Sequence, residues 1–92
     1  MRQIRLQNKV KADLLAIQIY TQNTWGTTKA EEMLFEIDQT FASIRSFPFL
    51  GKTTRGKNVF VKTLVNLPFI IVYKVDDTSI VVIKITHTKR RR

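Results

Sequence analysis

The sequence predicts an α+β fold, in which an N-terminal helical hairpin packs on one face of a small antiparallel sheet. Two observations support this prediction. Apolar residues recur at helical spacing through the first half of the chain, and they alternate with a period of two from residue 58 onward. The chain has 92 residues, which is enough for one core, so residues 1–92 are expected to form a single domain.

A short strand is expected over residues 1–6 and a first helix over residues 8–25. In the helical segment Val10, Leu14, Ile17 and Tyr20 are separated by three or four residues, which places them on one stripe of a helix. Trp25 is followed by a glycine, the residue type that most often stands just past a helix end. The first helix is therefore expected to bury this stripe and to stop at Trp25.

A second helix is expected over residues 28–46. The sequence Thr28-Lys29-Ala30-Glu31 has the spacing of a capping box, in which the Thr hydroxyl and the Glu carboxylate bind free backbone N–H groups. Pro48 disfavours helical geometry in the residue before it. Because about three residues separate the two helices, they are expected to pack as an antiparallel hairpin. The apolar stripe of this helix consists of Ala30, Met33, Leu34, Ile37, Phe41 and Ile44.

Three strands are expected at residues 58–65, 69–76 and 79–86, after a loop at residues 48–57. The short links between them indicate an antiparallel meander. Alternation then assigns the faces. The uncharged set is expected to face the helices: Val59, Val61, Val65, Phe69, Ile71, Tyr73, Val75, Val81, Ile83 and Ile85. The other set is expected to form an exposed basic face: Lys62, Lys74 and Lys84, with Phe60, Ile70, Val72 and Val82 between them.

Positive charge is concentrated in the second half of the chain. Residues 1–50 contain six Lys or Arg and five acidic residues, a net charge of +1, whereas residues 51–92 contain ten and two, a net charge of +8. Such an uneven distribution favours a polyanionic or acidic partner. The last four residues are all cationic, and we interpret the basic tail at residues 87–92 as an electrostatic contact element.

The composition excludes several kinds of chemistry. Cysteine is absent and histidine occurs once, so neither a thiol nucleophile nor a structural zinc site is expected, and no cofactor is expected. The acidic residues between Glu31 and Asp38 fall on a helix, and Asp76 and Asp77 fall in a turn. Two hypotheses remain: binding alone, or metal-free cleavage of a phosphodiester. In the second, His87 would transfer a proton, and Arg55, Lys62, Lys84 or Arg90 would stabilise the developing charge.

No apolar run approaches the roughly 20 residues that span a bilayer, and the first residues lack the core of a signal peptide. A cytoplasmic location without membrane contact is therefore expected.

Three segments resemble the RelE/ParE superfamily of bacterial type II toxins. "VKADLLAIQIYTQNTWG" at residues 10–26 is similar to the family's first helix. "FASIRSFPFLGK" at residues 41–52 is similar to its helix end and Pro-x-x-Gly loop. "IIVYKVDD" followed by "IVVIKITHTKR", within residues 70–90, is similar to its last two strands and the closing His-x-x-Arg. Together the segments follow the family's order along nearly the whole chain.

The resemblance implies a toxin that a cognate antitoxin holds inactive, with operator DNA bound only through the antitoxin. It implies either DNA gyrase or the ribosome with its mRNA as target. The chain has no arginine between Arg55 and Arg90, no acidic residue at 47–57 and no tyrosine after His87, which favours a ParE-like gyrase inhibitor over a RelE-like mRNA endonuclease. An inactive or differently targeted relative is the remaining alternative.

The resemblance also suggests roles for particular residues. If the toxin is RelE-like, its catalytic residues would be His87, Lys62, Lys84 and Arg90; if it is ParE-like, none is expected. Expected antitoxin contacts are Leu15, Ile19, Phe35 and Phe60, as exposed apolar residues beside a groove between helices and sheet. Expected contacts with the target or a polyanion are Arg55, Lys62, Lys74, Lys84, Lys89, Arg90, Arg91 and Arg92.

Overall fold

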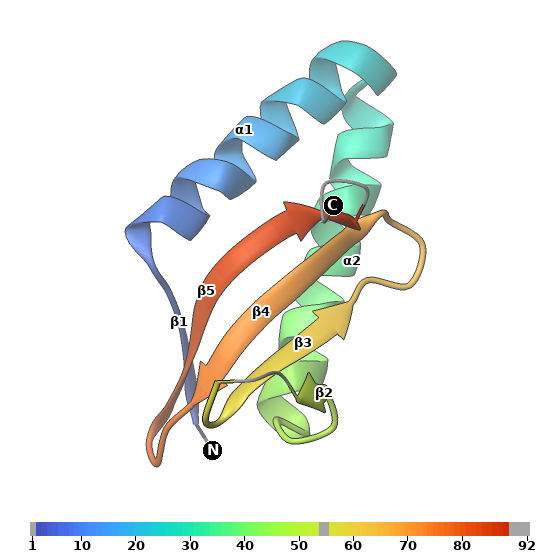
Figure 1. The fold of residues 1–92 in the computed structure, drawn as a ribbon. Coiled ribbons are helices and arrows are strands. Elements are labelled where there is room, and N and C mark those ends of the chain that lie inside the picture. Colours follow the sequence, from blue (N-terminus) through green and yellow to red (C-terminus); the bar gives the residue numbers. More distant parts are fainter. Residues whose placement is uncertain (1, 54–55, 89–92) are drawn as a thin grey trace.

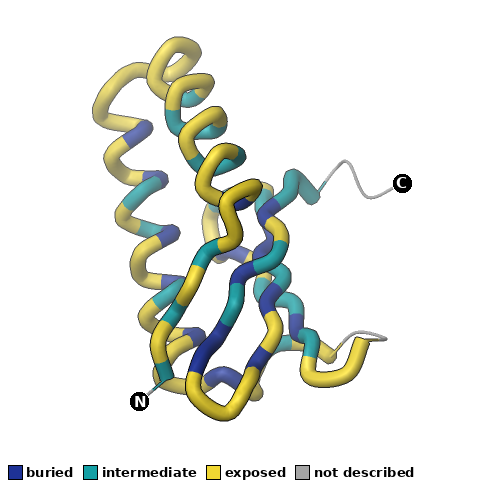
Figure 2. The backbone as a smooth tube through the Cα atoms, turned by 90° about the vertical axis from the view of Figure 1, so that its left-hand side faces the viewer, coloured by how far each residue is buried: buried dark blue, intermediate teal, exposed yellow. Residues whose placement is uncertain are grey.

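The computed structural model describes residues 2–53 and 56–88 and has two layers, with two helices on one side and a sheet on the other (Figures 1 and 2). The chain forms β1 (Gln3–Leu6), α1 (Asn8–Trp25), α2 (Thr27–Ser46), β2 (Lys52–Thr53), β3 (Val59–Thr63), β4 (Phe69–Val75) and β5 (Ser79–His87). The α+β class and the helical hairpin are confirmed.

The two helices meet at a single glycine. Gly26 has a φ angle of 98°, which a residue with a side chain adopts only with strain. Its N–H donates to the Gln22 carbonyl at 2.9 Å, and its own carbonyl accepts from the Ala30 N–H at 3.1 Å, so it ends α1 and begins α2. The predicted capping box at Thr28 is wrong, because α2 already begins at Thr27 and no side chain caps it.

The sheet has five strands in the order β1-β5-β4-β3-β2. The predicted meander is confirmed as β3, β4 and β5, which pair antiparallel. The prediction of a purely antiparallel sheet is wrong, because β1 pairs parallel with β5 from Gln3 to Leu6. The predicted loop at 48–57 also contains β2, which pairs with β3 for two residues.

The core lies between the helices and the helix-facing side of the sheet. Val10 from α1 and Met33, Ile37 and Ile44 from α2 are buried there. Figure 1 views the molecule from the opposite side, with α2 behind the strands. The sheet contributes seven buried residues from β3, β4 and β5 to this core: Phe60, Ile71, Tyr73, Val75, Ile80, Val82 and Ile85.

The predicted facing of the strands is correct for β4 apart from Ile70, but wrong for most of β3 and part of β5. In β3, Phe60 lies opposite the buried Tyr73, whereas Val59 lies opposite the exposed Lys74. Lys62 lies opposite the buried Ile71, so its position belongs to the helix-facing side. Val65 lies in the turn after β3 and is 84% exposed, while Leu64 is buried.

A bulge explains the error in β5. Val72 pairs with Lys84 and Tyr73 with Val82, so Ile83 is an extra residue in β5. Val82 before the bulge and Ile85 after it are both buried, although they are three residues apart. The predicted assignments of Val81 and Ile83 to the core, and of Val82 to the exposed face, are therefore wrong. Ile70, predicted to be exposed, is also buried.

Candidate functional site

The side of the sheet away from the helices carries a group of cations, here called the open face. The strand register aligns Lys52, Val61, Val72 and Lys84 in one row across four strands. A second row runs through Val59, Lys74, Val81 and Arg5. The open face is therefore defined by these eight residues, and its four cationic side chains are exposed while its four valines are half-buried.

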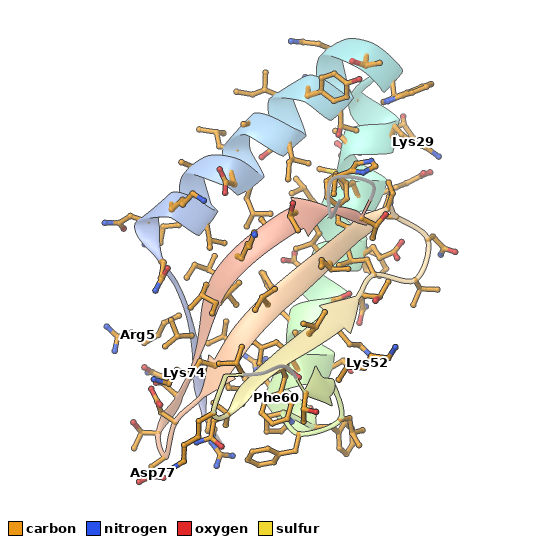
Figure 3. The ribbon with its side chains drawn as sticks, viewed as in Figure 1. Arg5, Lys29, Lys52, Phe60, Lys74 and Asp77 are labelled. Atoms are coloured by element: carbon orange, nitrogen blue, oxygen red, sulfur yellow. The ribbon has the colours of Figure 1, made fainter. Side chains whose placement is uncertain are left out.

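No acidic residue belongs to either row of the open face. Within the part of the chain that the structure describes, the one salt bridge joins Lys29 to Glu32 on α2, at 3.7 Å. Arg5, Lys74 and Lys84 thus have no ion-pair partner among the described residues. Figure 3 shows Arg5 and Lys74 toward the left of the view and Lys52 toward the right, so the labelled cations are spread across the width of the sheet. The predicted exposure of Lys74 and Lys84 on one basic face is confirmed, and Lys52 and Arg5 join them.

A groove of about 790 Å³ separates α1 from the end of β5. Its helical wall contains Lys9, Asp13, Ala16, Ile17 and Tyr20. Its sheet wall contains Phe69 from β4 and Lys84, Ile85, Thr86 and His87 from β5. β1 pairs with β5 only as far as Val82, so the groove begins where the parallel pairing ends.

His87 contacts an aromatic residue inside this groove. Its ring meets Phe69 edge to face, with ring centroids 5.3 Å apart and an angle of 76° between the planes. The two residues are also register partners in the β4–β5 pair. The ring thus has a packing role at the end of the sheet.

The residues proposed for phosphodiester cleavage do not all come together. Lys84 and His87 line the same groove. Lys62 belongs to the helix-facing side of β3, opposite Ile71, whereas Lys84 belongs to the open face. Arg55, Lys89, Arg90, Arg91 and Arg92, and with them most of the predicted basic tail, lie outside the described residues.

Three of the four predicted antitoxin contacts are exposed. Leu15 and Ile19 lie one helical turn apart on α1 and are 57% and 51% exposed, and Phe35 on α2 is 64% exposed. The expectation for Phe60 is wrong, because its side chain is 7% exposed and stacks on Tyr73 with ring centroids 5.7 Å apart. Phe60 therefore belongs to the core.

An exposed apolar loop between α2 and β2 was not among the predicted contact residues. Phe47, Phe49 and Leu50 are all exposed, whereas Pro48 is buried. Phe49 meets the ring of Phe60 at 5.7 Å, and the Arg2 guanidinium lies 5.3 Å from the Phe49 centroid. The Pro-x-x-Gly pattern was the available signal for this loop.

A hydrogen bond from the buried Tyr73 holds this loop in place. Its buried hydroxyl donates to the Pro48 carbonyl at 2.8 Å. Burial raises the pKa of the Tyr73 hydroxyl above its ordinary value of 10.0, and a hydrogen bond with the Gly51 backbone opposes this rise. A Cβ at Gly51 would lie 2.5 Å from the Tyr73 hydroxyl and 3.0 Å from the Val61 carbonyl, so glycine leaves the space that the contact needs.

The described residues contain no cluster of three His, Cys, Asp or Glu side chains that could hold a metal ion. Neither described helix is long and apolar enough to cross a bilayer. The acidic Glu36 instead accepts a hydrogen bond from the Asn66 N–H, 2.6 Å from its Oε2.

Comparison with known proteins gives a consistent picture. A family model described as the ParE toxin of the type II toxin–antitoxin system parDE matches residues 4–92. A solved structure titled "Chromosomal ParDE TA system from P. aeruginosa" is 22% identical, with a TM-score of 0.83 over 95% of this chain and 96% of that chain. No curated protein matches the chain. Since the family model covers nearly the whole sequence, this chain belongs to the ParE toxin family of type II toxin–antitoxin systems.

Proposed function

We propose that this ParE-type toxin inhibits DNA gyrase and that a cognate antitoxin neutralises it. Its membership of the ParE family is the observation that carries the proposal. The open face supports it, because four exposed cations favour a target with a strongly negative surface. An endonuclease would need its groups for proton transfer and charge stabilisation together, and Lys62 does not lie with Lys84 and His87.

Ribosome-dependent mRNA cleavage is the second candidate. The observation in its favour is that His87 and Lys84 line one groove. Against it, the His87 ring packs on Phe69, and Lys62 belongs to the other side of the sheet from Lys84. This geometry favours gyrase inhibition.

The antitoxin is proposed to bind beside the groove between α1 and β5. Leu15 and Ile19 form an exposed apolar pair on α1, the helix that also forms one wall of the groove. An amphipathic segment can bury such a pair by helix-in-groove packing. Lys9 and Lys84 at the groove, together with the net charge of +8 over residues 51–92, favour an acidic segment.

The test of the target is plasmid supercoiling by purified gyrase, with and without the toxin. We expect supercoiling to fall and cleaved linear plasmid to accumulate in proportion to the toxin added. A parallel reaction with ribosomes and mRNA should give intact message. Unaffected gyrase together with ribosome-dependent cleavage would replace the proposal with the second candidate.

The test of neutralisation is thermal unfolding with and without the antitoxin encoded beside this toxin. A partner that binds only the folded state adds about 4 kcal/mol to the free energy of unfolding at a concentration 1,000-fold above its Kd. Leu15→Ser combined with Ile19→Ser should weaken binding at least tenfold. Val65→Ser is the control, because Val65 is also an exposed apolar residue, at 84%, but lies in the β3–β4 turn. Equal losses in the two variants would contradict the proposed site.

A further inference from the structure

We propose that the open face binds duplex DNA directly, through the phosphates and without regard to base sequence. This inference rests on the proposed function in one respect: gyrase supplies a DNA-bound target. Direct binding goes beyond it, because the toxin would then hold the DNA of the complex as well as the enzyme.

The charge of the open face favours a polyanion. Arg5, Lys52, Lys74 and Lys84 are exposed, and no carboxylate shares their two rows. Within the described residues none of the four has an ion-pair partner, so binding a phosphate would not require breaking an existing pair. A surface of this kind releases counterions from DNA when it binds, and that release supplies most of non-specific affinity.

The spacing of the cations matches the dimensions of duplex DNA. Lys52 on β2 and Lys84 on β5 end one row, three strand spacings or about 14 Å apart. Lys74 and Arg5 lie in the second row, two strand spacings or about 10 Å apart. The major groove of B-DNA is about 12 Å wide. Flexible side chains at these separations can therefore reach phosphates on both sides of one groove.

The side chains between the cations favour duplex DNA over single-stranded nucleic acid. Proteins that bind single strands stack the bases on aromatic side chains. Between its cations the open face has Val59, Val61, Val72 and Val81, and no aromatic ring. The β-branched residues give a smooth surface that contacts the backbone of a duplex but offers no stacking platform. Figure 1 shows this side of the sheet uncovered by α2.

The experiment measures binding of the full chain to a fluorescent 20-base-pair duplex over a range of salt concentrations, without gyrase. Four phosphate contacts predict a slope of roughly −3.6 in log Kobs against log salt. Lys74→Gln combined with Lys84→Gln should reduce that slope by about 1.8 and weaken binding about tenfold or more. Lys11→Gln combined with Lys29→Gln removes the same charge from exposed positions on the helices and should leave binding within about twofold.

Each outcome decides the question. Equal losses in the two double variants would attribute binding to net charge and overturn the assignment to the open face. Stronger binding to a single-stranded RNA of the same length would overturn the duplex as ligand, and no binding at low salt would overturn the proposal altogether. A wild-type toxin that inhibits gyrase but does not bind the duplex would refute this inference alone. DNA binding with unaffected gyrase would refute only the proposed function.

Discussion

The two sides of the sheet are built from alternate residues of the same strands, yet they differ in almost every physical property. In β4, Ile71 and Tyr73 are fully buried against the helices, while Val72 between them is half-buried on the open face. The buried core on the helix-facing side is apolar apart from the Tyr73 hydroxyl, which donates to the Pro48 carbonyl. The open face combines valines with exposed cations.

The difference indicates a division of roles. Side chains on the helix-facing side lose water completely on folding, so they determine the stability of the domain. Cations on the open face lose little water and lack ion-pair partners in the described part of the chain, so they contribute little to stability. Charge that does not stabilise a fold is available for recognition. Substitutions on the two sides should therefore separate stability from function.

The largest expected effect compares two adjacent residues of β4. Ile71→Ala removes a fully buried side chain and should lower the free energy of unfolding by about 2–5 kcal/mol. Val72→Ala on the open face should cost about 1 kcal/mol or less, because that side chain is half-exposed. Urea denaturation followed by circular dichroism measures both. Similar losses would contradict the division between the sides.

Removal of the Tyr73 hydroxyl should have the next largest effect. Tyr73→Phe leaves the Pro48 carbonyl without its donor and should cost about 1–3 kcal/mol.

The pKa of Tyr73 adds a test by pH. Because burial raises this pKa, the folded state keeps its proton at a pH where the unfolded state has lost it. The stabilisation from this proton is therefore fully present below pH 10.0 and declines as the pH rises through the folded-state value. The difference in unfolding free energy between wild type and Tyr73→Phe should shrink above pH 10. A constant difference would show that the hydroxyl does not titrate with unfolding.

The sequence was sufficient for the helices and the meander, because long segments with regular periodicity leave little choice of structure. Val10, Leu14 and Ile17 predicted the packed stripe of α1, and Val10 is fully buried. The start of α2 was harder to predict. The sequence contains a capping-box pattern at Thr28, but Gly26 with its positive φ allows a tighter turn and an earlier start.

The facing of the strands could not be predicted by alternation alone. One inserted residue, Ile83, reverses the alternation in β5, and nothing in an apolar run marks which residue is extra. In β3 the charge of Lys62 led to the wrong assignment of faces. Lys62 belongs to the helix-facing side, but its side chain stays half-exposed because it lies near the margin of the sheet. Only two cations of the open face, Lys74 and Lys84, were predicted. Lys52 was not, because its segment was expected to be a loop, and Arg5 was not, because the short strand at residues 1–6 was not placed in the sheet.

A smaller effect is expected for His87, which is the last residue of β5 and lies opposite Phe69. His87→Ala loses the edge-to-face contact with Phe69 and should cost about 0.5–1.5 kcal/mol. Inhibition of gyrase by the free toxin should stay within about twofold, because the ring has a packing role. If His87 transferred a proton in RNA cleavage, activity would instead fall by about 10²–10⁴. Supercoiling and mRNA-cleavage assays on the same variant distinguish these results.

The smallest effect on stability should accompany the clearest effect on function. Lys74→Gln combined with Lys84→Gln should leave the free energy of unfolding within about 0.5 kcal/mol, because both side chains are exposed and neither has an ion-pair partner among the described residues. Inhibition of gyrase should nevertheless weaken about tenfold, and more at higher salt.

The matched variant, Lys11→Gln with Lys29→Gln, should be close to wild type in both its free energy of unfolding and its inhibition of gyrase. It breaks one salt bridge, between Lys29 and Glu32, and this pair is exposed on α2 and therefore weak. Loss of stability in the Lys74 and Lys84 variant would mean that the open face takes part in holding the fold together. If the two double variants inhibited gyrase equally well, gyrase would recognise another surface of the toxin. The exposed loop at Phe47, Phe49 and Leu50 would then be the next to substitute. That loop is held by the Tyr73 hydroxyl, so the helix-facing side would then serve recognition indirectly, by fixing the loop's shape.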